Sequence, residues 1–160
     1  MSLTQLRNLG IVANAGISTT KLGTGAVLQA ITATDSTQRN SSSSTFVTVS
    51  NTLSVSITPS SASNKVLVIA TANIATGSGA QGVFTIFRGA TNLGNGNGGM
   101  TNVITNNYGT ITMSILDSPS TTSSTTYQVY GRAVGGGNFI INSGAGGDTL
   151  GTITALEIAG

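Results

Sequence analysis

Residues 47–74 read VTVSNTLSVSITPSSASNKVLVIATANI, and this stretch carries the strongest structural signal of the chain. In its first half, apolar side chains alternate with Ser and Thr, which is the two-residue period of a strand with one face on a core. The apolar positions are Val47, Val49, Leu53, Val55 and Ile57. Pro59 and the polar residues after it predict a turn. The uninterrupted apolar run 66–70 then predicts a second strand that lies mid-sheet and is covered on both faces.

The same short-strand pattern recurs along the rest of the chain. Further strands are expected in 26–33, 83–89, 109–118, 125–134, 138–142 and 150–160, with loops over 33–45 and 89–102. In the last strand, Leu156 and Ile158 are expected to face inward. Roughly eight to ten short strands, separated by turn signals, predict an all-β antiparallel sandwich or jelly roll.

The first 27 residues differ from the remainder. Leu3, Leu6 and Leu9 recur every third residue and Ile11 follows, but Gly10 and later glycines interrupt any regular element. Such a segment buries too little apolar area to order itself. We therefore expect residues 1–27 to be an arm that attaches through these four apolar side chains to another surface, and residues 28–160 to be the sandwich domain. A frayed terminus is the alternative.

Composition narrows the function classes. The chain has 160 residues, enough for one domain, and only 6% of them are charged. A surface with so few charges tolerates close packing against identical copies, which favours a permanent assembly. The six basic residues are scattered, so no nucleic-acid surface is expected. No apolar run is long enough for a membrane span and no signal peptide is recognisable, which predicts synthesis in the cytoplasm without membrane contact.

Catalytic chemistry is not expected. The chain has neither His nor Cys, so a serine nucleophile would lack a base and a thiolate metal site is excluded. The four acids are Asp35, Asp117, Asp148 and Glu157, and they are too scattered to predict a glycosidase pair or a metal site. Asp117 and Asp148 are interpreted as turn residues. We therefore expect no enzyme activity, no cofactor and no bound metal.

Glu157 has two interpretations. It alternates with Leu156 and Ile158, so it is expected on the opposite face of the terminal strand from these two residues. The favoured interpretation is a solvated charge on an edge strand. The alternative is an ion pair between subunits, with Arg88 or Arg132 as the partner.

Several phrases of the sequence resemble one known group of proteins. The phrases are GTGAVLQ at 23–29, ATDSTQR at 33–39, SVSITPSSASNKVLVIA at 54–70 and GTITALEIAG at 151–160. They resemble the small β-rich virion proteins of tailed phages, especially phages that infect cyanobacteria. The strand order is also similar to that of trimeric C1q/TNF-like jelly rolls.

The resemblance implies a homotrimeric structural component of a phage particle, located in the virion. One role that it implies is that of a capsid decoration (cement) protein, whose arm clamps the major capsid protein. The other is a short tail fibre or receptor-binding tip, attached to tail proteins, that contacts host-surface carbohydrate through a loop with Asn95 and Asn97 and through Tyr108. The lack of a long shaft favours cement. A polysaccharide depolymerase is a third and weaker alternative, because the chain has no paired acids.

Overall fold

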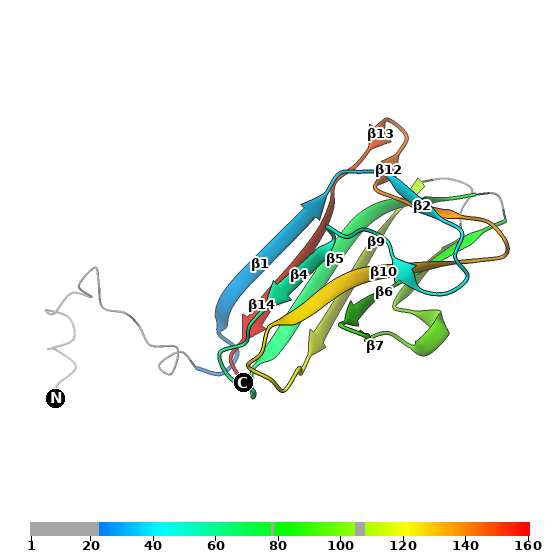
Figure 1. The fold of residues 1–160 in the computed structure, drawn as a ribbon. Coiled ribbons are helices and arrows are strands. Elements are labelled where there is room, and N and C mark those ends of the chain that lie inside the picture. Colours follow the sequence, from blue (N-terminus) through cyan, green and yellow to red (C-terminus); the bar gives the residue numbers. More distant parts are fainter. Residues whose placement is uncertain (1–22, 78, 105–107) are drawn as a thin grey trace, which may run out of the picture.

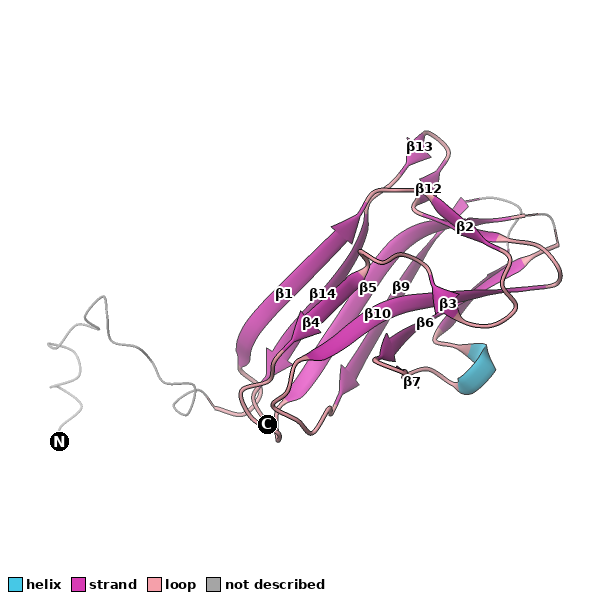
Figure 2. Cartoon of the chain, viewed as in Figure 1, coloured by secondary structure: helices cyan, strands magenta, loops and turns pink. Residues whose placement is uncertain are grey.

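The computed structural model describes residues 23–77, 79–104 and 108–160. In this part of the chain, two antiparallel sheets pack face to face (Figures 1 and 2). The expected antiparallel β-sandwich is confirmed. The apolar arm residues Leu3, Leu6, Leu9 and Ile11 lie outside the described residues.

The first sheet, called sheet A, is centred on β5. Its members are β1 (Val27–Asp35), β14 (Gly151–Ile158), β5 (Lys65–Thr76), β9 (Tyr108–Asp117), β11 (Phe139–Ile141) and β2 (Arg39–Ser41). One side of β5 pairs with β14 and then with β11, and the other side pairs with β9. The position of the 66–70 run in the middle of a sheet is therefore confirmed.

The second sheet, called sheet B, is centred on β10. Its members are β3 (Val47–Thr48), β4 (Ser54–Ile57), β10 (Thr125–Val134), β6 (Gln81–Arg88), β7 (Thr91–Asn92) and β8 (Thr101–Ile104). A small hairpin of β12 (Ser143–Gly144) and β13 (Gly147–Asp148) stands apart from both sheets. One sheet contains the strand order β1-β14-β5-β9 and the other contains β4-β10-β6-β8, which is the strand order of a jelly roll.

The core is formed by the inward faces of both sheets, as the alternating pattern predicts. Val55 and Ile57 of β4 are buried, and so are Ile111 and Met113 of β9. Phe84 and Phe139 meet edge to face across the core, with ring centroids 5.1 Å apart. Gly131 lies against these rings: a Cβ atom there would be 2.9 Å from Phe139 Cζ and 2.8 Å from Val49 Cγ1.

Four expectations from the sequence are wrong. The run 66–70 is not covered on both faces, since burial alternates along β5 and Ile69 is 37% exposed. In β14 the inward residues are Ile153, Ala155 and Glu157, whereas Leu156 and Ile158 face outward and are half-buried. The expected loop 33–45 contains the end of β1 and all of β2, and the expected loop 89–102 contains β7 and the start of β8. The polar side chains of 33–45 pair with one another, and composition alone does not reveal this.

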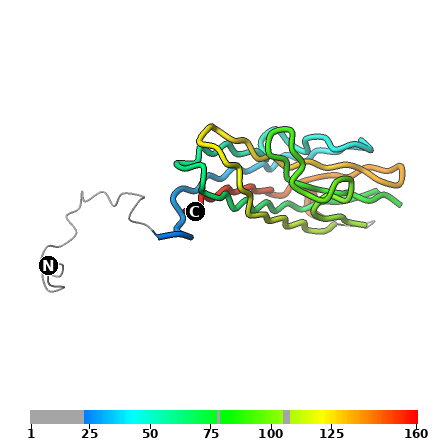
Figure 3. Tube along the Cα trace, turned by 90° about the horizontal axis from the view of Figure 1, so that it is seen from below, coloured from blue at the N-terminus to red at the C-terminus, as the bar shows by residue number. Residues whose placement is uncertain are grey.

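The two ends of the described chain meet at one end of the sandwich (Figure 3). Gly25 N donates to Ala159 O at 2.8 Å, and Ala159 N donates to Ala26 O at 2.9 Å. Pairing with the C-terminal residues therefore begins within the last residues of the expected arm. We call this the terminal end of the sandwich.

Candidate self-association surface

The outer face of sheet A carries a row of aliphatic side chains across four strands. Register places Ala30 of β1, Leu156 of β14, Leu67 of β5 and Leu116 of β9 side by side. Leu116 is 51% exposed, and Leu67 and Leu156 are half-buried. Exposed apolar side chains that lie next to one another, rather than scattered singly, mark surfaces that bind other molecules.

Beyond this row the same face is formed mainly by threonine. The next row is Thr32, Thr154, Ile69 and Ser114, and the one after it is Thr34, Thr152, Thr71 and Thr112. Neighbouring hydroxyls bond to each other, as between Thr32 and Thr154 at 3.0 Å and between Thr71 and Thr112 at 3.3 Å. Because these hydroxyls are partly satisfied within the sheet, covering them costs less than covering unpaired polar groups.

The outer face is almost without charge. Among the residues of β1, β14, β5 and β9, only Lys65 is charged and faces outward. The acids of these strands lie elsewhere, since Asp35 and Glu157 are buried and Asp117 is paired with Arg88. A surface of leucine, isoleucine and threonine has the low charge that is typical of an interface core.

Behind this face, Glu157 holds the terminal end together. Its side chain is 1% exposed, and β14 lies between β1 and β5 rather than at an edge. Gln29 Nε2 donates to it at 2.5 Å and Asn64 Nδ2 at 2.6 Å, and Ser60 donates through N at 2.7 Å and through Oγ at 2.8 Å. The interpretation of Glu157 as a solvated edge charge is wrong.

These donors decide the charge state of Glu157. Burial by itself would raise the pKa of Glu157, but the hydrogen bonds from Gln29, Asn64 and Ser60 favour the carboxylate and lower it below its usual value. Its partners lie on β1 and in the turn after β4, so the carboxylate ties both to β14. An ion pair between subunits is not needed to satisfy it.

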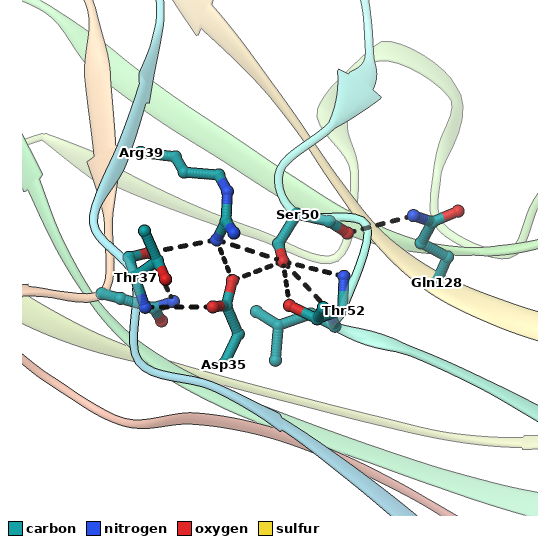
Figure 4. A network of polar contacts seen from close by, with 8 residues as sticks. Asp35, Thr37, Arg39, Ser50, Thr52 and Gln128 are labelled. Atoms are coloured by element: carbon teal, nitrogen blue, oxygen red, sulfur yellow. Dashed lines mark hydrogen bonds and ion pairs between the residues drawn. The ribbon is translucent and has the colours of Figure 1, made fainter.

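At the other end of β1, Asp35 is the centre of a second polar network (Figure 4). Its carboxylate pairs with Arg39 and accepts hydrogen bonds from Ser50 Oγ and, at 3.0 Å, from Thr37 N. Burial would raise the pKa of Asp35, but the bonds from Ser50 and Thr37 and the charge of Arg39 lower it. Gln128 Nε2 donates to Ser50 O at 3.0 Å, which joins the network to β10. The network therefore joins the end of β1 in sheet A to the segment after β3 and to β10 in sheet B.

The expected carbohydrate-binding residues lie on different elements. Asn95 and Asn97 are exposed in the loop around the short 3-10 helix η2 (Gly96–Gly98), and Asn97 O accepts a hydrogen bond from Arg132 Nε at 2.9 Å. This loop lies against sheet B, where Met100 N donates to Phe84 O at 2.8 Å. Tyr108 begins β9 in sheet A and is 49% exposed. Glycan binding by these residues stays a prediction.

An aromatic cluster on the outer face of sheet B was not predicted from the sequence. Phe87 stacks on Tyr130 with centroids 4.1 Å apart, Phe46 meets Phe87 edge to face at 6.0 Å, and Arg132 lies 5.6 Å from the centre of the Phe46 ring. Phe87 and Tyr130 belong to neighbouring strands, whereas Phe46 comes from the segment before β3. The cluster holds that segment on the sheet, and only the pairing of β6 with β10 could have revealed it.

Asp117 is also more than a turn residue. Arg88 Nη1 donates to both of its oxygens, at 2.9 and 2.8 Å, and Tyr127 Oη donates to Oδ2 at 2.7 Å. Burial raises the pKa of Tyr127, and the bond to Asp117 raises it further, so the phenol stays protonated and donates. The interpretation of Asp117 as a turn residue is corrected, because strand β9 delivers it to β6 and β10.

In the described ranges, no three His, Cys, Asp or Glu side chains gather as a metal site. Within those same ranges, no helix is long and apolar enough to cross a membrane. No protein-family model matches the chain, and no curated protein matches it. Any function proposed for this chain therefore rests on its residues and their arrangement.

Proposed function

We propose that this protein is a viral structural protein, a capsid decoration (cement) protein that binds and stabilises a phage head as a homotrimer. The observation that carries the self-association is the uncharged outer face of sheet A, with its row of Leu156, Leu67 and Leu116. Its role in a phage particle rests on the resemblance of the sequence to small virion proteins of tailed phages.

The chemistry of the outer face supports a second copy of the same chain as its partner. Two copies of a charged face would set like charges against each other, and among the described residues of β1, β14, β5 and β9 this face presents only Lys65, at one end. Aliphatic and hydroxyl groups pack against their own kind without that cost. A contact of this face with the same face of a second copy is two-fold, whereas in a ring of three the face meets a different patch of its neighbour. Three copies are supported by the resemblance alone.

The terminal end of the sandwich suits an arm that reaches a neighbouring protein. The described chain starts there, where Gly25 pairs with Ala159, and Glu157 fastens β1, β14 and the turn after β4 at the same end. Residues 1–22 precede this anchored point. In the proposed function they contact the major capsid protein through Leu3, Leu6, Leu9 and Ile11.

Counting copies per particle tests the proposal. A cement protein is expected at a copy number comparable to that of the major capsid protein, measured by quantitative gel or by imaging of purified virions. A few copies confined to the tail would contradict it. A second test deletes residues 1–22 and keeps Gly25: the sandwich is expected to fold and to be missing from particles, and particles with full occupancy would refute the role of the arm.

A short tail fibre or receptor-binding tip is the second candidate. The observation that favours it is Tyr108, an aromatic side chain that is 49% exposed, since exposed aromatic rings suit contact with sugars. A Tyr108→Ala virion is then expected to adsorb more weakly to host cells. Unchanged adsorption would dispose of this candidate.

A further inference from the structure

A concavity of about 370 Å³ lies on the terminal end of the sandwich, where β6 and β10 meet the loop after β9. Figure 1 places that loop, drawn in yellow, beside the C-terminus. The concavity is lined by Arg88, Gly89, Pro119, Thr121, Ser124, Thr125 and Thr126. Its volume falls in the range of small-molecule sites, ~300–1,000 Å³.

We propose that this concavity binds a neutral saccharide. The inference does not depend on the proposed self-association, and it concerns a different place from Tyr108. Tyr108 and Asp117 stand at opposite ends of the ten-residue strand β9, about 30 Å apart at the rise of an antiparallel strand.

The lining has the mixture of groups that a sugar requires. Four of the seven lining residues carry hydroxyls. Thr121 Oγ1 accepts from Ser123 N and can still donate, whereas Thr125 Oγ1 donates to Ser123 O and can still accept. The Thr126 hydroxyl bonds to Ser56 Oγ and keeps an acceptor lone pair. The Pro119 ring adds an apolar surface for the carbon side of a pyranose. A sugar presents hydroxyls and C–H groups together, so both kinds of lining are used.

The charge balance favours a neutral ligand over an anion. Arg88 is the only charged residue that lines the concavity, and Asp117 neutralises it with two hydrogen bonds to Nη1. Asp117 is in turn held by Tyr127. A phosphate, sulfate or sugar acid would therefore meet a paired arginine rather than a free one.

Arg88 still has donors to offer. Its bonds to Asp117 and to Ser118 O all use Nη1, whereas a guanidinium carries five N–H groups on three nitrogens. The Nε and Nη2 donors stand outside those bonds. The pair with Asp117 restrains the guanidinium at Nη1, and the remaining N–H groups can donate to sugar hydroxyls.

The walls of the concavity are ordered before any ligand arrives. Ser123 N donates to Thr121 Oγ1 at 3.0 Å, Thr125 Oγ1 donates to Ser123 O at 3.1 Å, and Gly89 N donates to Thr126 O at 2.9 Å. A loop held in this way loses little freedom on binding. One shallow site of this kind is expected to bind with a Kd on the order of a millimolar, and copies in one assembly would add avidity.

Titration of the full chain with neutral disaccharides (maltose, lactose and cellobiose), followed by amide NMR, tests the inference. At least one sugar is expected to shift the amides of Gly89 and of residues 121–126 in a saturable way. Inorganic phosphate and glucuronate are expected to leave them unmoved at the same concentrations. Absence of saturable shifts with every disaccharide, or shifts with phosphate or glucuronate alone, would overturn it.

A matched pair of variants separates the concavity from the rest of the loop. Ser124 lines the concavity and is exposed, so Ser124→Phe is expected to fill it without disturbing the core and to weaken sugar binding at least about tenfold. Ser123 is exposed on the same loop outside the lining, and its two hydrogen bonds to the loop use backbone N and O, which a substitution keeps. Ser123→Phe is therefore expected to bind as the unmodified chain does. Equal binding by both variants, or equal loss, would contradict the assignment.

Discussion

Leu67 of β5 and Leu156 of β14 stand opposite each other in the antiparallel register of sheet A, both on the face turned away from the core. Leu116 continues the row on the far side of Leu67. A sandwich whose charged residues make up 6% of the chain thus places leucines side by side in the centre of an outer face. This relationship carries the proposal that the sheet packs against a second copy.

Charge introduced into the centre of this face is expected to separate the copies. Leu67→Lys would bury an unpaired charge in any contact made by this face, and a half-buried leucine on an outer face tolerates lysine better than a core residue does. The matched control is Thr48→Lys, at an exposed position of sheet B. Light scattering after size-exclusion chromatography is expected to show a smaller species for Leu67→Lys only. An unchanged mass for Leu67→Lys would argue against the face.

Acid is expected to destabilise the fold through Glu157 and Asp35. Both pKa values are lowered in the folded chain, so their contribution is complete above the ordinary carboxyl pKa of about 4 and is lost as the pH falls through the lowered values. Urea unfolding between pH 2 and pH 7 is expected to show stability that falls in acid.

Replacing Glu157 by glutamine measures how much of the loss of stability in acid comes from this carboxylate. Glu157→Gln leaves Gln29 and Asn64 donors facing an amide, so it is expected to cost about 1–3 kcal/mol at neutral pH and less in acid. Asp148→Asn, at an exposed position of β13, serves as the control and is expected to follow the unmodified chain. A Glu157→Gln chain with the full acid dependence would show that Glu157 does not titrate with folding.

The hydrogen bond from Tyr127 to Asp117 is expected to stabilise the fold by about 1 kcal/mol. Tyr127→Phe removes the donor and keeps the buried ring, while Arg88 still satisfies both oxygens of Asp117. Denaturant unfolding measures the loss. No difference in the free energy of unfolding would mean that Arg88 alone satisfies the carboxylate.

Gly131 is expected to be intolerant of any side chain. Gly131→Ala would push a methyl group against Val49, Phe139 and Phe84 and is expected to cost ~1–3 kcal/mol. Gly146 has open space where its Cβ would stand, so Gly146→Ala is the matched control and is expected to be nearly neutral. Thermal unfolding of both variants distinguishes a packing clash from a general effect of replacing glycine.

Much of the architecture was predictable from residue alternation. The period of two in 47–57 correctly identified the inward residues Val55 and Ile57, because one face of β4 is buried. In β14 the same pattern gave the wrong face, since Ile153, Ala155 and Glu157 face inward. A glutamate is usually exposed, and the sequence does not show that this one is buried. Its donors come from β1 and from the turn after β4, far away in the chain.

The leucine row, the aromatic cluster and the concavity could not be predicted from the sequence for a related reason. The leucine row requires the register of four strands, and the aromatic cluster requires that of β6 with β10. The concavity at Arg88 depends on β9 bringing Asp117 beside β6. Local patterns do not contain these pairings.

Sedimentation equilibrium of the purified full chain is the most direct measurement of the central claim. We expect a single species with three times the 15.9 kDa mass of one chain, over a range of concentrations and at physiological salt. Leu67→Lys is expected to dissociate that species. A chain that sediments at 15.9 kDa at every concentration would contradict the claim that the outer face of sheet A joins identical copies.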